Sequence, residues 1–88
     1  MTLDAQAVQA IDGFLAGAVA DGATVSALRQ FVPHLMVTRV DALDMRDETP
    51  FRRYAQCDLF LVDGRDHCWK ITGDPEAATG IALAPKGA

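Results

Sequence analysis

The stretch DLFLVDGRDHCWKI, from Asp58 to Ile71, decides the fold expected for this chain. Two runs of apolar and β-favouring residues flank Asp63-Gly64, a dipeptide that readily adopts the positive φ angles of a tight reversal. The stretch therefore predicts a β-hairpin, and we expect the rest of the chain to cover it.

The length of the turn determines which side chains of this hairpin share a face. A two-residue turn places Leu59 opposite Cys68 and brings Cys57 close to Cys68 on one face. A three-residue turn places Asp58 opposite Lys70 and puts Cys57 and Cys68 on different faces. In that second register one face gathers Leu59, Leu61, Trp69 and Ile71. The sequence leaves both registers open.

Two amphipathic helices are expected before the hairpin. The first spans Thr2 to Ala20, with Thr2 or Asp4 as N-cap and Gly22 as the C-terminal stop. Its buried face is expected to hold Leu3, Ala7, Ile11, Phe14, Leu15 and Ala18. The second begins at Thr24 as N-cap and ends before Pro33. Its buried stripe is expected to hold Val25, Leu28, Phe31 and Val32.

Further strands are expected on both sides of the hairpin. Leu35 to Val40 is rich in β-branched residues and predicts the first strand, and Ile81 to Ala84 predicts the last. Between hairpin and last strand, Asp74 and Pro75 are typical of the start of a single helical turn. Helices followed by strands predict one α+β domain over residues 1–88, in two layers: an N-terminal helical hairpin packed on an antiparallel three- to four-stranded β-sheet.

Charge and composition exclude several classes of partner. The net charge of −4 in 88 residues disfavours nucleic acid and anionic membranes. No apolar run has the roughly 18 residues that a membrane span needs. Two cysteines are too few for a disulfide scaffold, so thiols in a reducing, cytoplasmic compartment are expected.

Candidate partner-binding residues lie at the end of the segment Asp41 to Tyr54. Phe51, Arg52, Arg53 and Tyr54 combine aromatic rings with arginines, the residue types that dominate interaction hot spots. The alternative is that the aromatics pack under the sheet while the arginines offset neighbouring acids. Trp69 is either a core residue or a further contact. A patch of small residues on the first helix would let another helix come close, as in a homodimer; its members are Gly13, Ala16, Gly17 and Ala20. The alternative is that alanine is there only as a good helix former.

The candidate metal ligands are Cys57, Cys68, His67 and His34. Adjacent residues on a strand point to opposite faces, so His67 and Cys68 do not easily serve one ion. The chain has no C-x-x-C pair, and buried, inert thiols are the default expectation. The alternative function is a metal or metallocluster-binding protein that uses Cys57, Cys68 and a histidine.

Catalytic motifs are absent from the sequence. It contains no Gly-rich phosphate loop, no G-x-S-x-G elbow and no H-E-x-x-H helix. We therefore expect a non-enzymatic accessory or protein-interaction module with no cofactor.

The motifs LVDGRDHC, from Leu61 to Cys68, and DPEAATG, from Asp74 to Gly80, together with PHL at Pro33 to Leu35, carry a resemblance. The chain resembles a family of short proteobacterial proteins that is associated with nitrogen-fixation gene neighbourhoods. The resemblance covers the C-terminal third best. It implies an accessory role around nitrogenase or its metallocluster assembly, and it supplies no catalytic residues.

Overall fold

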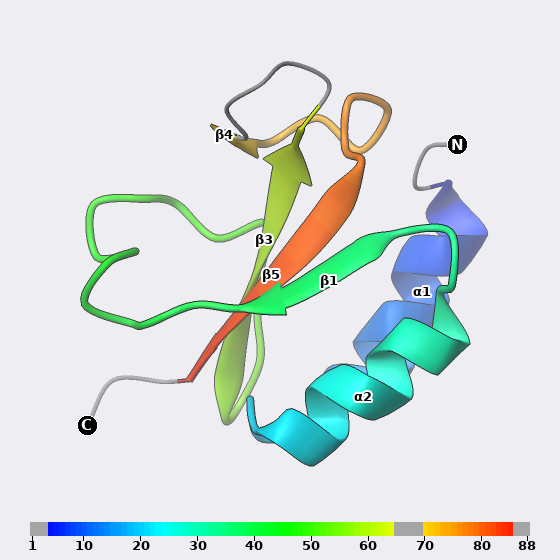
Figure 1. Ribbon diagram of the computed structural model, residues 1–88, viewed down its shortest axis with the longest axis horizontal. Coiled ribbons are helices and arrows are strands. Elements are labelled where there is room, and N and C mark those ends of the chain that lie inside the picture. Colours follow the sequence, from blue (N-terminus) through cyan, green and yellow to red (C-terminus); the bar gives the residue numbers. More distant parts are fainter. Residues whose placement is uncertain (1–3, 65–69, 86–88) are drawn as a thin grey trace.

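Two helices followed by five strands make up the computed structural model, which describes residues 4–64 and 70–85 (Figure 1). The helices are α1 (Ala5–Leu15) and α2 (Gly22–Phe31). The strands are β1 (Met36–Arg39), β2 (Arg52–Arg53), β3 (Cys57–Asp63), β4 (Lys70–Thr72) and β5 (Gly80–Pro85). The predicted α+β class, with N-terminal helices and a sheet, is confirmed.

The strand order of the sheet is β1-β5-β3-β2, and β4 also pairs with β3. The expected sheet of three or four antiparallel strands is in fact a mixed sheet of five, because β1 runs parallel to β5 while the other pairs are antiparallel. The longest ladder joins β3 to β5, from Cys57 opposite Pro85 to Val62 opposite Gly80.

Both helices cover one face of the sheet (Figure 1). Alternate residues of β3 and β5 point to that face, as strand geometry requires, and meet apolar residues of the helices. This helix-facing core includes Ile11, Leu15, Val25, Leu28, Cys57, Leu59, Leu61, Ile81 and Leu83. Each large apolar side chain buried there contributes about 1.5–3 kcal/mol to stability.

The segment 41–50 covers the other face of the sheet. A second buried cluster there joins Met45 of this segment to Phe60 and Val62 of β3 and to Ala82 and Ala84 of β5. This segment, which contains no helix or strand, therefore supplies part of the core before β2 begins. Coverage on both faces explains why LFLV in β3 is continuously apolar instead of alternating.

Both helices begin at aspartates. Asp4 accepts a hydrogen bond from the backbone N–H of Ala7 (2.8 Å), and Asp21 accepts one from Thr24 (2.8 Å). The bond from Thr24 also lowers the pKa of Asp21. Asp21, and not the expected Thr24, is thus the N-cap of α2, and Gly22 opens α2 instead of stopping α1. The first helix ends at Leu15, well before the expected Ala20.

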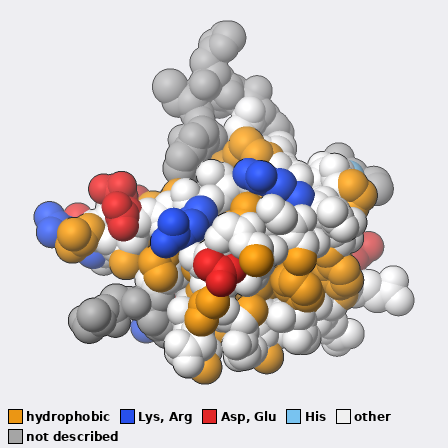
Figure 2. Space-filling view, turned by 60° about the horizontal axis from the view of Figure 1, so that its bottom comes forward, with side chains coloured by type: hydrophobic (Ala, Val, Ile, Leu, Met, Phe, Trp, Pro, Cys, Tyr) orange, Lys and Arg blue, Asp and Glu red, His pale blue; other side chains and the backbone are white. Residues whose placement is uncertain are grey.

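Phe14 and Phe31 were expected in the buried stripes, and this expectation was wrong. Their rings stack on each other with centroids 5.6 Å apart, and the residues are 36% and 46% exposed. Hydrophobic side chains gather over the helical layer in Figure 2. Gly13 and Gly17 face open space, but α1 ends before Gly17 and Ala20 is buried, so the small residues do not form one continuous helix face.

The pairing of β3 with β4 follows neither of the two expected registers. Val62 lies opposite Ile71 and Asp63 opposite Lys70, so residues 64–69 connect the strands and Asp63-Gly64 is not a tight turn. The side of β3 at Asp58 and Leu59 is already paired with β2, which prevents β4 from pairing there. Cys57 belongs to the helix-facing core, and Cys68 lies outside the described residues.

Two arginines bind main-chain carbonyls beside β1. Arg29 donates from Nε and Nη2 to the carbonyl oxygen of Val37, at 3.2 and 3.1 Å. Arg39 donates from Nε to the carbonyl oxygen of Ala20, at 2.7 Å. These bonds fasten β1 to α2 and to the connection between the helices.

The parallel pair of β1 and β5 depends on the absence of a side chain at Gly80. A Cβ atom there would lie 2.7 Å from the carbonyl oxygen and 2.9 Å from the Cβ of Met36. We expect Gly80→Ala to lower the free energy of unfolding by about 1–3 kcal/mol, measured by urea denaturation, because β1 must move away.

Gly13→Ala in α1 is the matched control. Nothing lies within 4 Å of a Cβ atom at Gly13, so alanine should raise the free energy of unfolding by about 0.5–1 kcal/mol through its helix propensity. A Gly80→Ala variant as stable as the wild type would contradict the close approach of β1 and β5.

Candidate functional site

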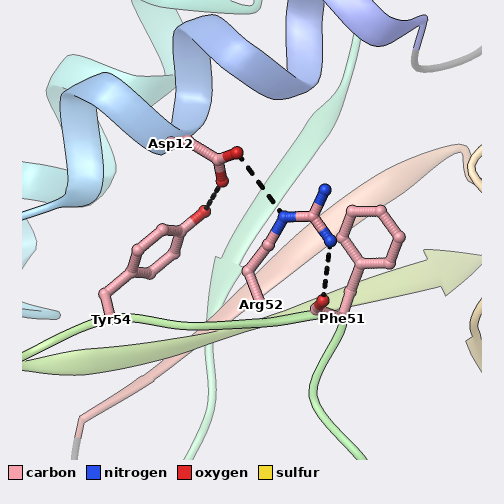
Figure 3. Close-up of polar contacts among 4 residues, drawn as sticks. All are labelled: Asp12, Phe51, Arg52 and Tyr54. Atoms are coloured by element: carbon pink, nitrogen blue, oxygen red, sulfur yellow. Dashed lines mark hydrogen bonds and ion pairs between the residues drawn. The ribbon is translucent and has the colours of Figure 1, made fainter.

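Asp12 of α1 holds β2 against the helical layer. Its Oδ1 accepts a hydrogen bond from the Tyr54 hydroxyl at 2.6 Å, and its Oδ2 lies 3.5 Å from Nε of Arg52 (Figure 3). Arg52 of the edge strand β2 and Tyr54, which directly follows this strand, thus bind one carboxylate. We call these residues, with Phe51, the Asp12 network.

Arg52 is held by further contacts besides its ion pair with Asp12. Its Nη1 donates to the carbonyl oxygen of Phe51 at 3.2 Å, and its guanidinium carbon lies 4.4 Å from the centroid of the Phe51 ring (Figure 3). A guanidinium at this distance over an aromatic face gains electrostatic attraction. The arginine is therefore positioned although its side chain is 43% exposed.

Tyr54 is a hydrogen-bond donor throughout the ordinary pH range. Partial burial and, after it, the carboxylate of Asp12 raise the pKa of Tyr54 well above its usual value near 10, because both disfavour the phenolate. Tyr54 and Phe51 also pack against the helix-facing core. This agrees with the alternative in which the two aromatics pack under the sheet, although Arg52 pairs with Asp12 of α1 and not with the acidic residues that precede it in the chain.

Arg53 lies on the opposite face of the sheet from Arg52. It stands opposite Asp58 in the β2–β3 ladder and lines a cavity of about 250 Å³ beside Met45 and Phe60. The four residues from Phe51 to Tyr54, expected as one partner-binding set, are therefore divided between two faces. Trp69, the remaining member of that set, lies outside the described residues.

An open groove of about 700 Å³ borders the Asp12 network. We call it the α1–β2 groove; α1 forms one wall, Phe51 and Arg52 a second, and the turn at 74–76 the third. Its apolar lining residues are Ala5, Val8, Phe51 and Pro75. Its polar lining residues are Asp4, Gln9, Asp12, Arg52, Asp74 and Glu76. Val8 is buried and Phe51 and Pro75 are half-buried, and we call these three the floor of the groove; the exposed residues Asp4, Asp74 and Glu76 form its rim. An apolar floor with polar groups around it is the usual character of a binding site.

The sequence predicts the turn that forms the third wall, but not that this turn lies beside α1 and β2. Asp74 accepts from the backbone N–H of Glu76 at 3.0 Å, and its carbonyl accepts from Ala77 at 3.1 Å. Sequence reasoning missed Asp12 and this wall as parts of a site. One signal was present for Asp12: Asp4, Val8 and Asp12 follow each other at i, i+4 and i+8, which places them along one side of a helix.

The candidate metal ligands in the described residues lie far apart. Cys57 is fully buried in the helix-facing core, while His34 is exposed in the turn before β1. β1 begins opposite Gly80 and Cys57 lies opposite Pro85, so roughly 17 Å separates these positions along the strands. Cys68 and His67 lie outside the described residues. Within residues 4–64 and 70–85, no three His, Cys, Asp or Glu side chains are grouped as metal ligands.

The chain belongs to a family of unknown function, DUF6129, whose family model matches residues 11–86. Comparison with curated proteins and with solved structures gives no significant match. The matched range includes Asp12, Phe51 to Tyr54 and the turn at 74–76, but not Asp4 or Ala5 at the start of α1. Neither helix in the described part of the chain has both the length and the hydropathy to cross a bilayer.

The hydrogen bond of Tyr54 gives a pH-dependent contribution to stability. We expect Tyr54→Phe to lower the free energy of unfolding at neutral pH by about 1 kcal/mol, since a bond to a carboxylate is lost. The raised pKa of Tyr54 in the folded state means that this stabilisation is full below the unfolded-state pKa of about 10 and declines as the pH rises above it.

Urea denaturation of both proteins between neutral and alkaline pH measures this difference. Tyr54 is the only tyrosine, so other alkaline titrations are common to the two proteins. The difference in unfolding free energy should shrink above about pH 10. A difference that stays constant over the whole range would contradict the bond between Tyr54 and Asp12.

The burial of Cys57 predicts an inert thiol. In a Cys68→Ser variant Cys57 is the only cysteine, and we expect iodoacetamide to modify it at least about 100-fold more slowly in buffer than in denaturing urea. Mass spectrometry of timed samples measures both rates. Rapid modification of the folded variant would instead support a nucleophilic or metal-binding thiol.

Proposed function

We propose that this protein is a non-enzymatic interaction module. Because the function of its family is unknown, the proposal rests on the α1–β2 groove. A segment of a partner protein binds in the α1–β2 groove, between α1, Phe51 with Arg52, and the turn at 74–76. The observation that carries the proposal is an open, apolar-floored groove whose wall holds a stacked arginine and phenylalanine. Arginine and aromatic residues are enriched among the residues that dominate binding energy.

The Asp12 network supports binding because it fixes the wall of the groove in advance. Arg52 contacts Asp12, the Phe51 carbonyl and the Phe51 ring before any partner arrives. A side chain that is already ordered loses little conformational entropy on association, whereas a free one costs about 0.5–1.5 kcal/mol.

The polar side chains of the groove also favour binding over chemistry. Asp4 caps α1, Asp12 binds Tyr54 and Arg52, and Asp74 accepts a bond from the backbone of its own turn. Carboxylates with these structural partners organise the walls. This supports a non-enzymatic module, together with a sequence that lacks the familiar catalytic motifs.

The resemblance to proteins from nitrogen-fixation gene neighbourhoods suggests which partners to examine first. We include in the proposal an accessory role around nitrogenase or its metallocluster assembly, in the cytoplasm. This part rests on the sequence motifs alone. A homodimer, the other expected association, would use a different surface, for which the exposed Phe14 and Phe31 stack is the apolar candidate.

A tryptophan placed inside the groove tests the proposal. Ala5 is exposed in the first turn of α1 and lines the groove, so Ala5→Trp should fill it and reduce partner capture by at least about tenfold. The measurement is quantitative mass spectrometry after capture from native extract with the immobilised protein. Reversing the charge of Arg52 is a poorer test, because it would also break the contact with Asp12.

Ala10→Trp is the matched control, since Ala10 is an exposed alanine of the same helix outside the groove. It should retain every partner that Ala5→Trp loses. Partners lost with Ala10→Trp but kept with Ala5→Trp would contradict the proposal and point to the surface that carries Phe14. Circular dichroism on both variants verifies that α1 still forms.

A further inference from the structure

We propose that the α1–β2 groove selects a partner segment that carries lysine or arginine beside an apolar residue. This inference rests on the proposed function and adds the chemistry of the segment. The described residues that line the groove carry four carboxylates and one guanidinium, which leaves a net charge of −3. An extended segment with positive side chains is the complementary occupant.

Arg52, the one positive side chain among the described lining residues, is already compensated. Arg52 lies 3.5 Å from Asp12 and covers the ring of Phe51, so its charge is directed toward the wall. The carboxylates of Asp4, Asp74 and Glu76 then dominate the rim. All three belong to exposed residues, so their carboxylates are accessible to an incoming cation.

The other described arginines are placed away from the groove. Arg29 and Arg39 bind carbonyl oxygens beside β1, and Arg46 and Arg53 line the cavity on the opposite face of the sheet. Among the described residues, therefore, none of these four arginines neutralises the rim of the groove.

Two of the rim carboxylates are oriented by the backbone. Asp4 accepts from the N–H of Ala7 and Asp74 from the N–H of Glu76, each through Oδ1. A carboxylate has about four lone-pair sites on two oxygens, so one such bond leaves acceptor capacity for an ammonium or guanidinium group.

An anionic occupant is disfavoured at the same place. The N-terminus of α1 is the feature of this groove that would attract an anion, because helix N-termini carry partial positive charge. Asp4 already occupies that position through its bond to Ala7, and Val8 donates to the carbonyl of Asp4. An incoming carboxylate or phosphate would therefore meet Asp4 itself.

The apolar floor explains why the segment needs more than charge. Val8, Phe51 and Pro75 offer hydrophobic contact below the acidic rim. The aliphatic stem of lysine or arginine can lie on such a surface while its charged end reaches the carboxylates. An apolar residue between two basic residues would use the remaining floor.

Titration of isotope-labelled protein with two defined peptides tests the inference by NMR. One is a short capped peptide of alternating lysine and leucine, and the other carries glutamate in place of lysine. We expect the lysine peptide to shift the amide signals of groove residues and to bind at least about tenfold more tightly than the glutamate peptide. Its affinity should fall as salt is raised from about 50 to about 200 mM.

A neutralised variant identifies the carboxylates responsible. Asp4→Asn, Asp74→Asn and Glu76→Gln combined remove three charges while keeping acceptor groups, and asparagine is as good an N-cap as aspartate. The three changes are combined because a single exposed ion pair contributes little binding energy. Together they should weaken binding of the lysine peptide at least about tenfold. The control combines Asp41→Asn, Asp44→Asn and Asp47→Asn, which change the net charge equally outside the groove, and should bind as the wild type does.

The outcomes separate this inference from the proposed function. Equal affinity for the two peptides, no binding of the lysine peptide, or unchanged binding by the groove-neutralised variant would overturn the selection for positive charge. A partner that is lost with Ala5→Trp but retained by the groove-neutralised variant would overturn it as well, and would leave the proposed function standing. A partner that is insensitive to Ala5→Trp would overturn the proposed function itself.

Discussion

The pairing of β3 with β5 is the constraint on which the rest of the structure depends. Six residue pairs join these strands, and most of their side chains are buried, on both faces of the sheet. One face requires the helices and the other requires the segment 41–50, because a two-stranded ribbon is at best marginally stable in water. The parallel strand β1 and the short strands β2 and β4 are then added at the two sides of this pair.

The sequence was sufficient to predict the α+β class, the helices before the sheet and the buried character of β3, because hydrophobic periodicity is local. It was not sufficient to predict the strand partners. Asp63-Gly64 is a strong turn signal, but β2 occupies β3 at Asp58 and Leu59, and β4 pairs only from Leu61 onward. Asp63 pairs with Lys70, so neither the two-residue turn nor the three-residue turn is present.

The candidate site was predicted in part for a similar reason. Phe51 and Arg52 could be recognised by residue type, and strand alternation puts Arg52 and Arg53 on opposite faces, but which face each takes depends on how β2 pairs with β3. Asp12 and Tyr54 are 42 positions apart in the chain. No local pattern links them, and the groove exists only because packing brings α1 to β2 and to the turn at 74–76.

The hydrogen bonds from Arg29 to the Val37 carbonyl affect whether another chain can add a strand to the sheet beside β1. In the parallel pair, Met36 and Val40 donate toward β5, so the intervening Val37 presents its carbonyl on the outer side of β1. An unpaired strand edge is a template for adding another strand, and natural proteins commonly blunt it with a charged side chain. Arg29 is such a charged side chain, because it binds a carbonyl oxygen that an incoming strand would need. This favours association through side-chain surfaces over addition of a strand to the sheet.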